Sequence, residues 1–257
     1  MLLGAILAER DTRIQVCGRV AVEFDGRDVT PALPVGQGRA LLAYLVLHRD
    51  RPAGRDELID ALWSKVPPPG AESALSALLS RLRRAIGDDA LTGRRELRLQ
   101  LPPDSWVDAH AAEMAIHRAQ SALAEGRWPD AYGPALVALI IARRGFLPAP
   151  GAPWADAQRR RLEEIRCVAL ECYAEVCLQV GGGELAGGEK AARELVGRAP
   201  YRERGYALLM ELLAARGNMA EALIVYHGLR ERLREDLGVA PGRYLREIQA
   251  RLLHAGA

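Results

Sequence analysis

The segment from Glu72 to Gly87, ESALSALLSRLRRAIG, constrains the fold more than any other part of this sequence. Its large apolar residues recur at helical spacing and predict one buried stripe on an amphipathic helix: Leu75, Leu78, Leu79, Leu82 and Ile86. The opposite face holds small and basic side chains: Ser73, Ser76, Ala77, Ser80, Arg81 and Arg84. A helix that only had to be soluble would scatter glutamate and lysine there. This face therefore indicates a partner that approaches the helix closely.

Short strands and two further helices are expected around this segment. The stretch RIQVCGRVAVEFDGRDV alternates in hydropathy and contains Asp25-Gly26, which predicts a strand hairpin. Helices are expected at about residues 37–49 and 54–63. The following SKVPPPG is a stiff loop, because proline fixes φ and removes a hydrogen-bond donor. After Gly87, two short strands are expected to join at residues 92–95.

This order of elements favours an interaction with double-stranded DNA. A helix, a turn and a second helix with a small, basic outer face make a helix-turn-helix arrangement. Small side chains let such a helix enter the major groove, while arginines reach phosphates and guanine edges. Six arginines lie between Arg81 and Arg98, against three acidic residues. Arg94 and Arg95, at the hairpin tip, are expected along the backbone or in the minor groove. The alternative is a solvated helix whose arginines only suit its negative C-terminal end.

The chain changes character near residue 104, beyond which nearly everything is expected to be helical. The hydrophobic pattern predicts seven helices, near residues 108–124, 129–143, 153–180, 185–197, 202–215, 219–236 and 242–254. Asn218 with Glu221 suggests a capping box, and Gly238 a helix end. A spacing of glycine, small residue and apolar residue recurs at the 34-residue period of tetratricopeptide repeats, in Gly183, Gly188 and Ala192 and again in Gly217, Ala222 and Tyr226. The same spacing appears in Gly126, Ala131 and Ala135. The alternative is a generic helical bundle with chance glycines.

Several classes of protein are disfavoured by composition. The formal charge is only +2 and aromatic residues are 5%, too few for the stacking platforms of a single-strand binder. The four cysteines have no metal-ligand spacing and are expected to be buried thiols, without metal or cofactor. The histidines are scattered and no nucleophile or phosphate-binding motif is present, so catalytic residues are not expected. No run suits a membrane span or a clear leader peptide, and a cytoplasmic, non-enzymatic protein is expected.

Three strings resemble the Streptomyces antibiotic regulatory proteins, the SARP-type transcription activators. They are GRALLAYLVLHRDRPAGRDELIDALW, PPPGAESALSALLSRLRRAIG and LPPDSWVD. The resemblance continues through PWADAQRRRLEEIRCVALECYAE and NMAEALIVYHGLRERLREDLGVAPGRYLREI, which look like the bacterial transcriptional activator domain. It implies a mainly α fold with a small β component. An OmpR-type winged helix would occupy residues 12–104, and a tetratricopeptide-like domain residues 105–254. It also implies binding to direct repeats near promoters and recruitment of RNA polymerase.

The resemblance also suggests roles for individual residues. It makes Glu72–Gly87 the recognition helix, with Ser80 and Arg81 facing the groove and basic residues at Arg83 and Arg84. The other DNA-binding candidates are Arg39, expected on a phosphate, and Ser73, Ser76, Arg94 and Arg95. Residues Ser64 to Gly70 match the loop that faces polymerase in this fold. Its contact candidates are Ser64, Lys65 and Val66.

Two departures from the family pattern bear on these assignments. RRELRLQL replaces the family's usual Gly-Tyr-Arg-like wing strand, and Leu78 stands where many relatives have tyrosine or histidine.

Two other functions remain as alternatives. One is a tetratricopeptide scaffold that binds protein, and the other is a regulator gated by a small molecule or peptide. The sequence also leaves open a homodimer on DNA.

Overall fold

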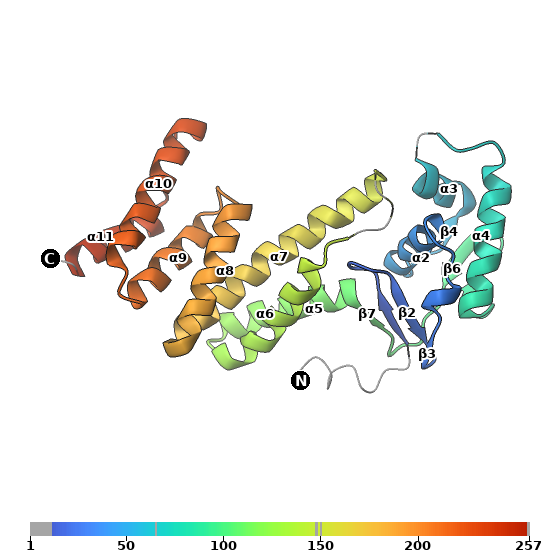
Figure 1. Cartoon of the computed structure of the whole chain (residues 1–257), viewed down its shortest axis with the longest axis horizontal. Coiled ribbons are helices and arrows are strands. Elements are labelled where there is room, and N and C mark those ends of the chain that lie inside the picture. Colours follow the sequence, from blue (N-terminus) through green and yellow to red (C-terminus); the bar gives the residue numbers. More distant parts are fainter. Residues whose placement is uncertain (1–11, 65, 147–148, 150, 256–257) are drawn as a thin grey trace. The chain divides into compact units, whose positions relative to one another are not determined.

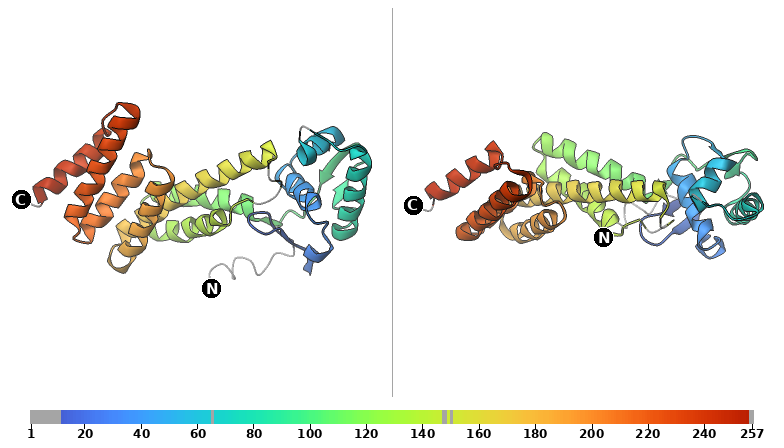
Figure 2. Two further views of the ribbon diagram at one scale, coloured as in Figure 1. Left: turned by 45° about the horizontal axis from the view of Figure 1, so that its top comes forward. Right: turned by 90° about the horizontal axis from the view of Figure 1, so that it is seen from above.

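The computed structural model describes residues 12–64, 66–146, 149 and 151–255. It is mainly helical, with a few short strands near the N-terminus (Figure 1, Figure 2). The chain divides into two compact units, one of Met1–Glu113 with Ile140–Glu163 and one of Met114–Leu139 with Glu164–Ala257. Within the described part of the chain, every helix is too short or too polar to cross a membrane. The predicted fold class, mainly α with a small β component, is confirmed.

Two small sheets frame the first unit. In the first, β1 (Arg13–Gln15), β2 (Ala21–Phe24) and β3 (Arg27–Asp28) are antiparallel, and β7 (Trp106–Val107) pairs parallel to β1. The second sheet has the order β4 (Ala53–Gly54), β6 (Glu96–Leu99), β5 (Leu91–Thr92). The predicted turn at Asp25-Gly26 joins β2 to β3, and both residues have positive φ. The sequence did not predict β4 or β7, because two-residue strands carry no periodic signal.

Three helices fill the space beside these sheets, and their bounds are close to those expected. They are α2 (Gln37–Leu47), α3 (Arg55–Trp63) and α4 (Ala71–Ile86), each of which contacts the other two. A short 3₁₀ turn, η1 (Thr30–Ala32), precedes α2. Residues of α2 that face the core are almost fully buried, Leu41 and Val46 among them. The order of strands, three helices and a final hairpin is that of a winged helix.

A buried carboxylate joins the first sheet to the helix that follows it. Asp108 opens α5 (Asp108–Ala124) and is fully buried. Its carboxylate accepts hydrogen bonds from the backbone N–H groups of Val16 at 2.9 Å, Cys17 at 3.0 Å and Ala109 at 2.8 Å. Burial raises the pKa of Asp108, although the three backbone donors act in the opposite direction. The carboxylate therefore supplies the acceptors for the N–H groups of Val16 and Cys17, which follow β1, and for the Ala109 N–H in the first turn of α5.

Long helices make up the rest of the chain. They are α6 (Trp128–Arg143), α7 (Pro153–Val180), α8 (Leu185–Arg198), α9 (Glu203–Ala215), α10 (Met219–Leu237) and α11 (Arg243–Ala255). A 3₁₀ turn, η2 (Gly182–Glu184), precedes α8. In the second unit α9 packs against α8, α10 and α11 around a core of leucine, alanine and tyrosine side chains. The predicted helices all occur, each within about two residues of its expected ends.

The recurrent small residues lie where helices pack closely. Ala192 and Ala222 are buried inside α8 and α10. A Cβ atom on Gly188 would lie 2.7 Å from Cys177 Cβ and 2.9 Å from a Leu212 methyl, so only glycine allows this approach of helices. Packing therefore accounts for this part of the 34-residue pattern.

One predicted helix cap is wrong. Asn218 stands at the N-cap of α10, but its side chain makes no capping hydrogen bond. Glu221, its expected partner, instead accepts a hydrogen bond from Arg193 at 2.5 Å. The charged guanidinium outcompetes the backbone N–H group that a capping box would engage. Gly238 does end α10, with a left-handed φ of 70°.

The four cysteines are buried, as expected. Burial raises the pKa of Cys172 to about 12 and also raises the pKa of Cys17. Their thiolate forms are therefore strongly disfavoured at neutral pH, which suits a packing role.

We predict that Asp108→Ala lowers the free energy of unfolding by about 2–4 kcal/mol, because the N–H groups of Val16 and Cys17 would be left buried without acceptors. Urea denaturation measures the change. Asp104→Ala is the control, since Asp104 is exposed and should change stability by less than about 0.5 kcal/mol. Equal losses in the two variants would contradict the proposed role of the carboxylate.

Candidate DNA-binding surface

The helix α4 has one buried face and one exposed face. Leu75, Leu79 and Leu82 are at most 1% exposed, whereas Leu78 lies at the boundary and is half-buried. The exposed side chains include all those that the sequence placed opposite the leucines: Ser73, Ser76, Ala77, Ser80, Arg81 and Arg84. Within the described residues, Arg81 and Arg84 form no ion pair or side-chain hydrogen bond. Their guanidinium groups therefore remain available to an external partner.

The hairpin of β5 and β6 presents a second basic site. Gly93 begins its turn with a φ of 85°, and a Cβ there would lie 1.8 Å from the carbonyl oxygen of Glu96. Only glycine fits this position. Arg94 and Arg95 follow at the exposed tip, and their side chains make no ion pair with any residue that the structure describes. The predicted hairpin is therefore present, with its arginines exposed.

Arg83 is placed differently from the other predicted arginines. It is half-buried, and its guanidinium donates to the backbone oxygens of Leu91 at 3.1 Å and Gly93 at 2.6 Å. These bonds join the C-terminal half of α4 to the hairpin. In this arrangement the Arg83 guanidinium braces the hairpin.

Arg55 is a residue of this surface that the sequence analysis did not identify. From the first turn of α3, its guanidinium contacts the Glu72 carboxylate at 2.6 Å and the Ser76 hydroxyl at 2.7 Å. A longer bond of 3.5 Å reaches the backbone oxygen of Arg94. One side chain thus connects α3, the first turns of α4 and the hairpin tip. No periodic pattern in the sequence predicts these contacts, because Arg55 is 17 residues from Glu72 and 39 from Arg94.

The remaining predicted residues lie on other parts of the first unit. Arg39, near the start of α2, is half-buried, and its Nε atom is buried without a hydrogen-bond partner in the described residues. Ser64 ends α3 with a positive φ of 52°. Val66 is 81% exposed in the loop that follows, whereas Lys65 lies outside the described residues.

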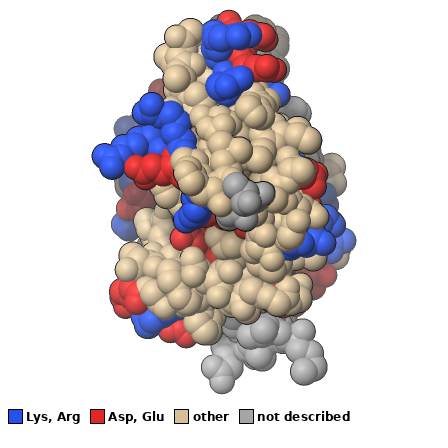
Figure 3. Space-filling view, turned by 90° about the vertical axis from the view of Figure 1, so that its left-hand side faces the viewer, with Lys and Arg blue, Asp and Glu red and all other residues tan. Residues whose placement is uncertain are grey.

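Arginines of the second unit contrast with those of α4, because many are paired with glutamates. The ion pairs include Arg166–Glu194, Arg193–Glu221, Arg202–Glu164, Arg204–Glu175 and Arg251–Glu211. Figure 3 shows basic and acidic side chains next to one another on one face, around a broad uncharged area. Such pairing reduces the attraction of this unit for a polyanion.

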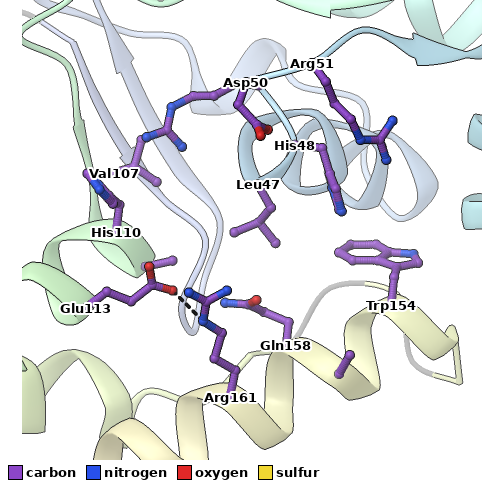
Figure 4. Close-up of a pocket in the computed structure, with 13 residues that line it drawn as sticks. Leu47, His48, Asp50, Arg51, Val107, His110, Glu113, Trp154, Gln158 and Arg161 are labelled. Atoms are coloured by element: carbon purple, nitrogen blue, oxygen red, sulfur yellow. Dashed lines mark ion pairs between the residues drawn. The ribbon is translucent and has the colours of Figure 1, made fainter.

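A separate hollow of about 650 Å³ lies between the end of α2 and the first turns of α5 and α7. Figure 4 shows His48 and Trp154 on one side of it and His110 and Glu113 on the other. Arg161 pairs with Glu113 at 2.8 Å, and the His48 ring stacks on Tyr44 at 4.2 Å. The residues around this hollow belong to neither α4 nor the hairpin.

We predict that Arg55→Ala accelerates amide hydrogen exchange in residues 71–76 and 93–96. The Arg55 contacts are partly exposed, so global stability should fall by less than about 1 kcal/mol. Exchange mass spectrometry measures the local effect, with Arg98→Ala as control, because Arg98 is an exposed hairpin arginine without an ion pair in the described structure. Identical exchange in wild type and Arg55→Ala would show that Arg55 does not order these segments.

Two family models match the chain. The model described as "Transcriptional regulatory protein, C terminal" matches residues 36–98, which contain α2, α3, α4 and the hairpin. The model described as "Bacterial transcriptional activator domain" matches residues 107–253, more than half of the chain.

Individual relatives agree with these matches. The chain is 38% identical to the regulatory protein AfsR of Streptomyces griseus over 233 residues, which are 85% of this chain and 22% of that protein. It is 30% identical to the transcriptional regulatory protein EmbR of Mycobacterium tuberculosis H37Rv, over 98% of this chain and 66% of that protein. The structure of Mycobacterium tuberculosis EmbR in complex with a low-affinity phosphopeptide is similar, with a TM-score of 0.79 and 27% identity. That similarity covers 96% of this chain and 66% of the other.

The chain therefore spans less than a quarter of AfsR and about two thirds of EmbR. In this chain the match to the "Transcriptional regulatory protein, C terminal" model precedes the match to the activator-domain model, and the exposed face of α4 lies within the first. The chain belongs to the family of SARP-type transcriptional regulators, which join an OmpR-type DNA-binding domain to a bacterial transcriptional activator domain.

Proposed function

We propose that this chain binds double-stranded DNA sequence-specifically and activates transcription from direct repeats near promoters. The observation that carries the proposal is the exposed face of α4, where small side chains surround two unpaired arginines. Serine and alanine let the helix backbone approach the floor of the major groove. Arg81 and Arg84 can then reach guanine edges or phosphates. The proposed function does not involve enzymatic catalysis.

The hairpin supplies a second contact. Arg94 and Arg95 at its exposed tip would lie on the DNA backbone or in the neighbouring minor groove. Arg83 and Arg55 would act indirectly, since both hold the hairpin against α4. Ser73 and Ser80 remain candidates for direct contact, whereas the Ser76 hydroxyl is already engaged by Arg55.

We propose that the chain consists of two functional domains that meet between residues 104 and 105. The first part would bind DNA, and the helical part, residues 105–254, would mediate protein contacts such as those between two copies on adjacent repeats. The loop that begins at Ser64 would face RNA polymerase. Its three prolines make it stiff, so that little conformational entropy is lost when it meets a partner.

We predict that Arg81→Ala weakens binding to the specific site by about 1–3 kcal/mol, roughly 5- to 150-fold, and relaxes the preference at one or two base pairs. A promoter footprint identifies the site, and titration of specific and random duplexes at fixed salt measures the loss. Arg27→Ala, on the exposed strand β3, serves as control and should bind like wild type. Equal losses on the specific and random duplexes would make Arg81 a phosphate contact only.

We predict that replacing Lys65 and Val66 together with alanine lowers transcript output while leaving the footprint intact. Val66 is 81% exposed and is therefore available to a partner. A transcription assay with purified polymerase measures the output. Val35→Ala is a matched control, because Val35 is 76% exposed elsewhere in the same unit. Wild-type activation by the double variant, or loss of its footprint, would refute the polymerase contact.

A further inference from the structure

A second basic site lies beside the N-terminal sheet, outside α4 and the hairpin. It is a hollow of about 490 Å³ whose wall includes four arginines from separate segments: Arg13, Arg19, Arg39 and Arg144. They come from β1, the segment between β1 and β2, the start of α2 and the turn that follows α6. The fold thus brings together like charges that are up to 131 residues apart in the sequence. We name this site the arginine hollow.

Few carboxylates balance these charges. The lining contains only two, Glu23 and Asp28. Glu23 pairs with Arg13 at a long 3.5 Å, and Asp28 accepts a hydrogen bond from the backbone N–H of Thr30 at 2.9 Å. Within the described residues, Arg19, Arg39 and Arg144 have no ion pair and no side-chain hydrogen bond. The lining thus contains four positive charges and two negative ones, and the buried carboxylate of Asp108, outside the lining, also interacts electrostatically with Arg144.

Two of the arginines also contain unsatisfied donors. The Nε atoms of Arg13 and Arg39 are buried, and no described residue supplies an acceptor. Buried donors of this kind are normally paired. An acceptor that reached the guanidinium groups would also relieve the mutual repulsion of the four charges.

The chemistry of the wall selects the ligand. Guanidinium groups bind phosphate with two parallel N–H···O bonds, and several of them can share one phosphate. Trp106 adds a half-buried aromatic surface, and Ala21 and Pro31 add apolar ones. The volume lies within the range of small-molecule sites. We propose that the arginine hollow binds a phosphate group.

Two sources share this chemistry. One is a free phosphorylated small molecule, and the other is a backbone phosphate of bound DNA, which would make the hollow a further anchor for the duplex. The proposal concerns the phosphate group and does not depend on α4 as the recognition helix. Its failure is therefore distinguishable from failure of the proposed function.

The test uses the full chain with Arg19 and Arg144 both changed to glutamine. The matched control is Arg27→Gln, which removes an exposed arginine of the same sheet that does not line the hollow. The probe is inorganic pyrophosphate, measured by isothermal titration calorimetry at constant ionic strength. A second arm measures the salt dependence of binding to a duplex of about 30 base pairs, long enough for several phosphate contacts.

With a free ligand as the source, pyrophosphate binds wild type and Arg27→Gln, and the double variant binds it at least about tenfold more weakly, as expected when two charge-assisted contacts are lost. With DNA as the source, pyrophosphate does not bind. The slope of log binding constant against log salt concentration, measured for the duplex, then falls in magnitude by about one to two in the double variant and stays unchanged in Arg27→Gln. The proposal is overturned if neither measurement separates the double variant from the control.

If the double variant does not fold, Ala21→Glu keeps the test decisive. A carboxylate at this half-buried position would enter the hollow and pair with its arginines. We expect Ala21→Glu to fold and to lose the pyrophosphate or salt-slope signal that wild type shows. Unchanged signals in Ala21→Glu would overturn the proposal.

Discussion

Burial of one leucine stripe determines how this protein presents its basic helix. Leu75, Leu79 and Leu82 of α4 are almost completely removed from water by α2 and α3. Each such side chain contributes about 1.5–3 kcal/mol of hydrophobic stabilisation, so rotating α4 about its axis would be very costly. The fixed orientation of α4 about its axis in turn makes Ser80, Arg81 and Arg84 face outward. The presentation of the recognition surface is thus a consequence of core packing.

The hairpin depends on a different kind of interaction. Its strands are short, and β6 also pairs with β4 to make a sheet of only three strands. Hydrogen bonds from Arg83 and Arg55 attach its backbone to α4 and α3. The arginines of α4, the hairpin and the start of α3 therefore fall into two groups, those that hold this surface together and those that remain unpaired on it within the described structure. Only the second group can gain new partners without breaking existing ones.

The two units use arginine in different ways. In the helical unit, ion pairs such as Arg166–Glu194 and Arg204–Glu175 join neighbouring helices. In the first unit, α4, the hairpin tip and the arginine hollow all leave guanidinium groups without carboxylate partners in the described structure. With a formal charge of only +2 over the chain, attraction to a polyanion comes from this local excess and not from total charge.

The sequence by itself determined the helices, the turn at Asp25-Gly26, the hairpin at Gly93 and the face that α4 exposes. These follow from apolar periodicity and from glycine, which act over a few residues. Only the tertiary structure decided that Arg83 and Arg55 brace the hairpin, that Glu221 pairs with Arg193 in place of capping α10, and that Asp108 holds β1. It alone also gathered Arg13, Arg19, Arg39 and Arg144 around one hollow. The physical reason is that a long charged side chain chooses partners by distance in space, and chain folding sets those distances between residues far apart in sequence.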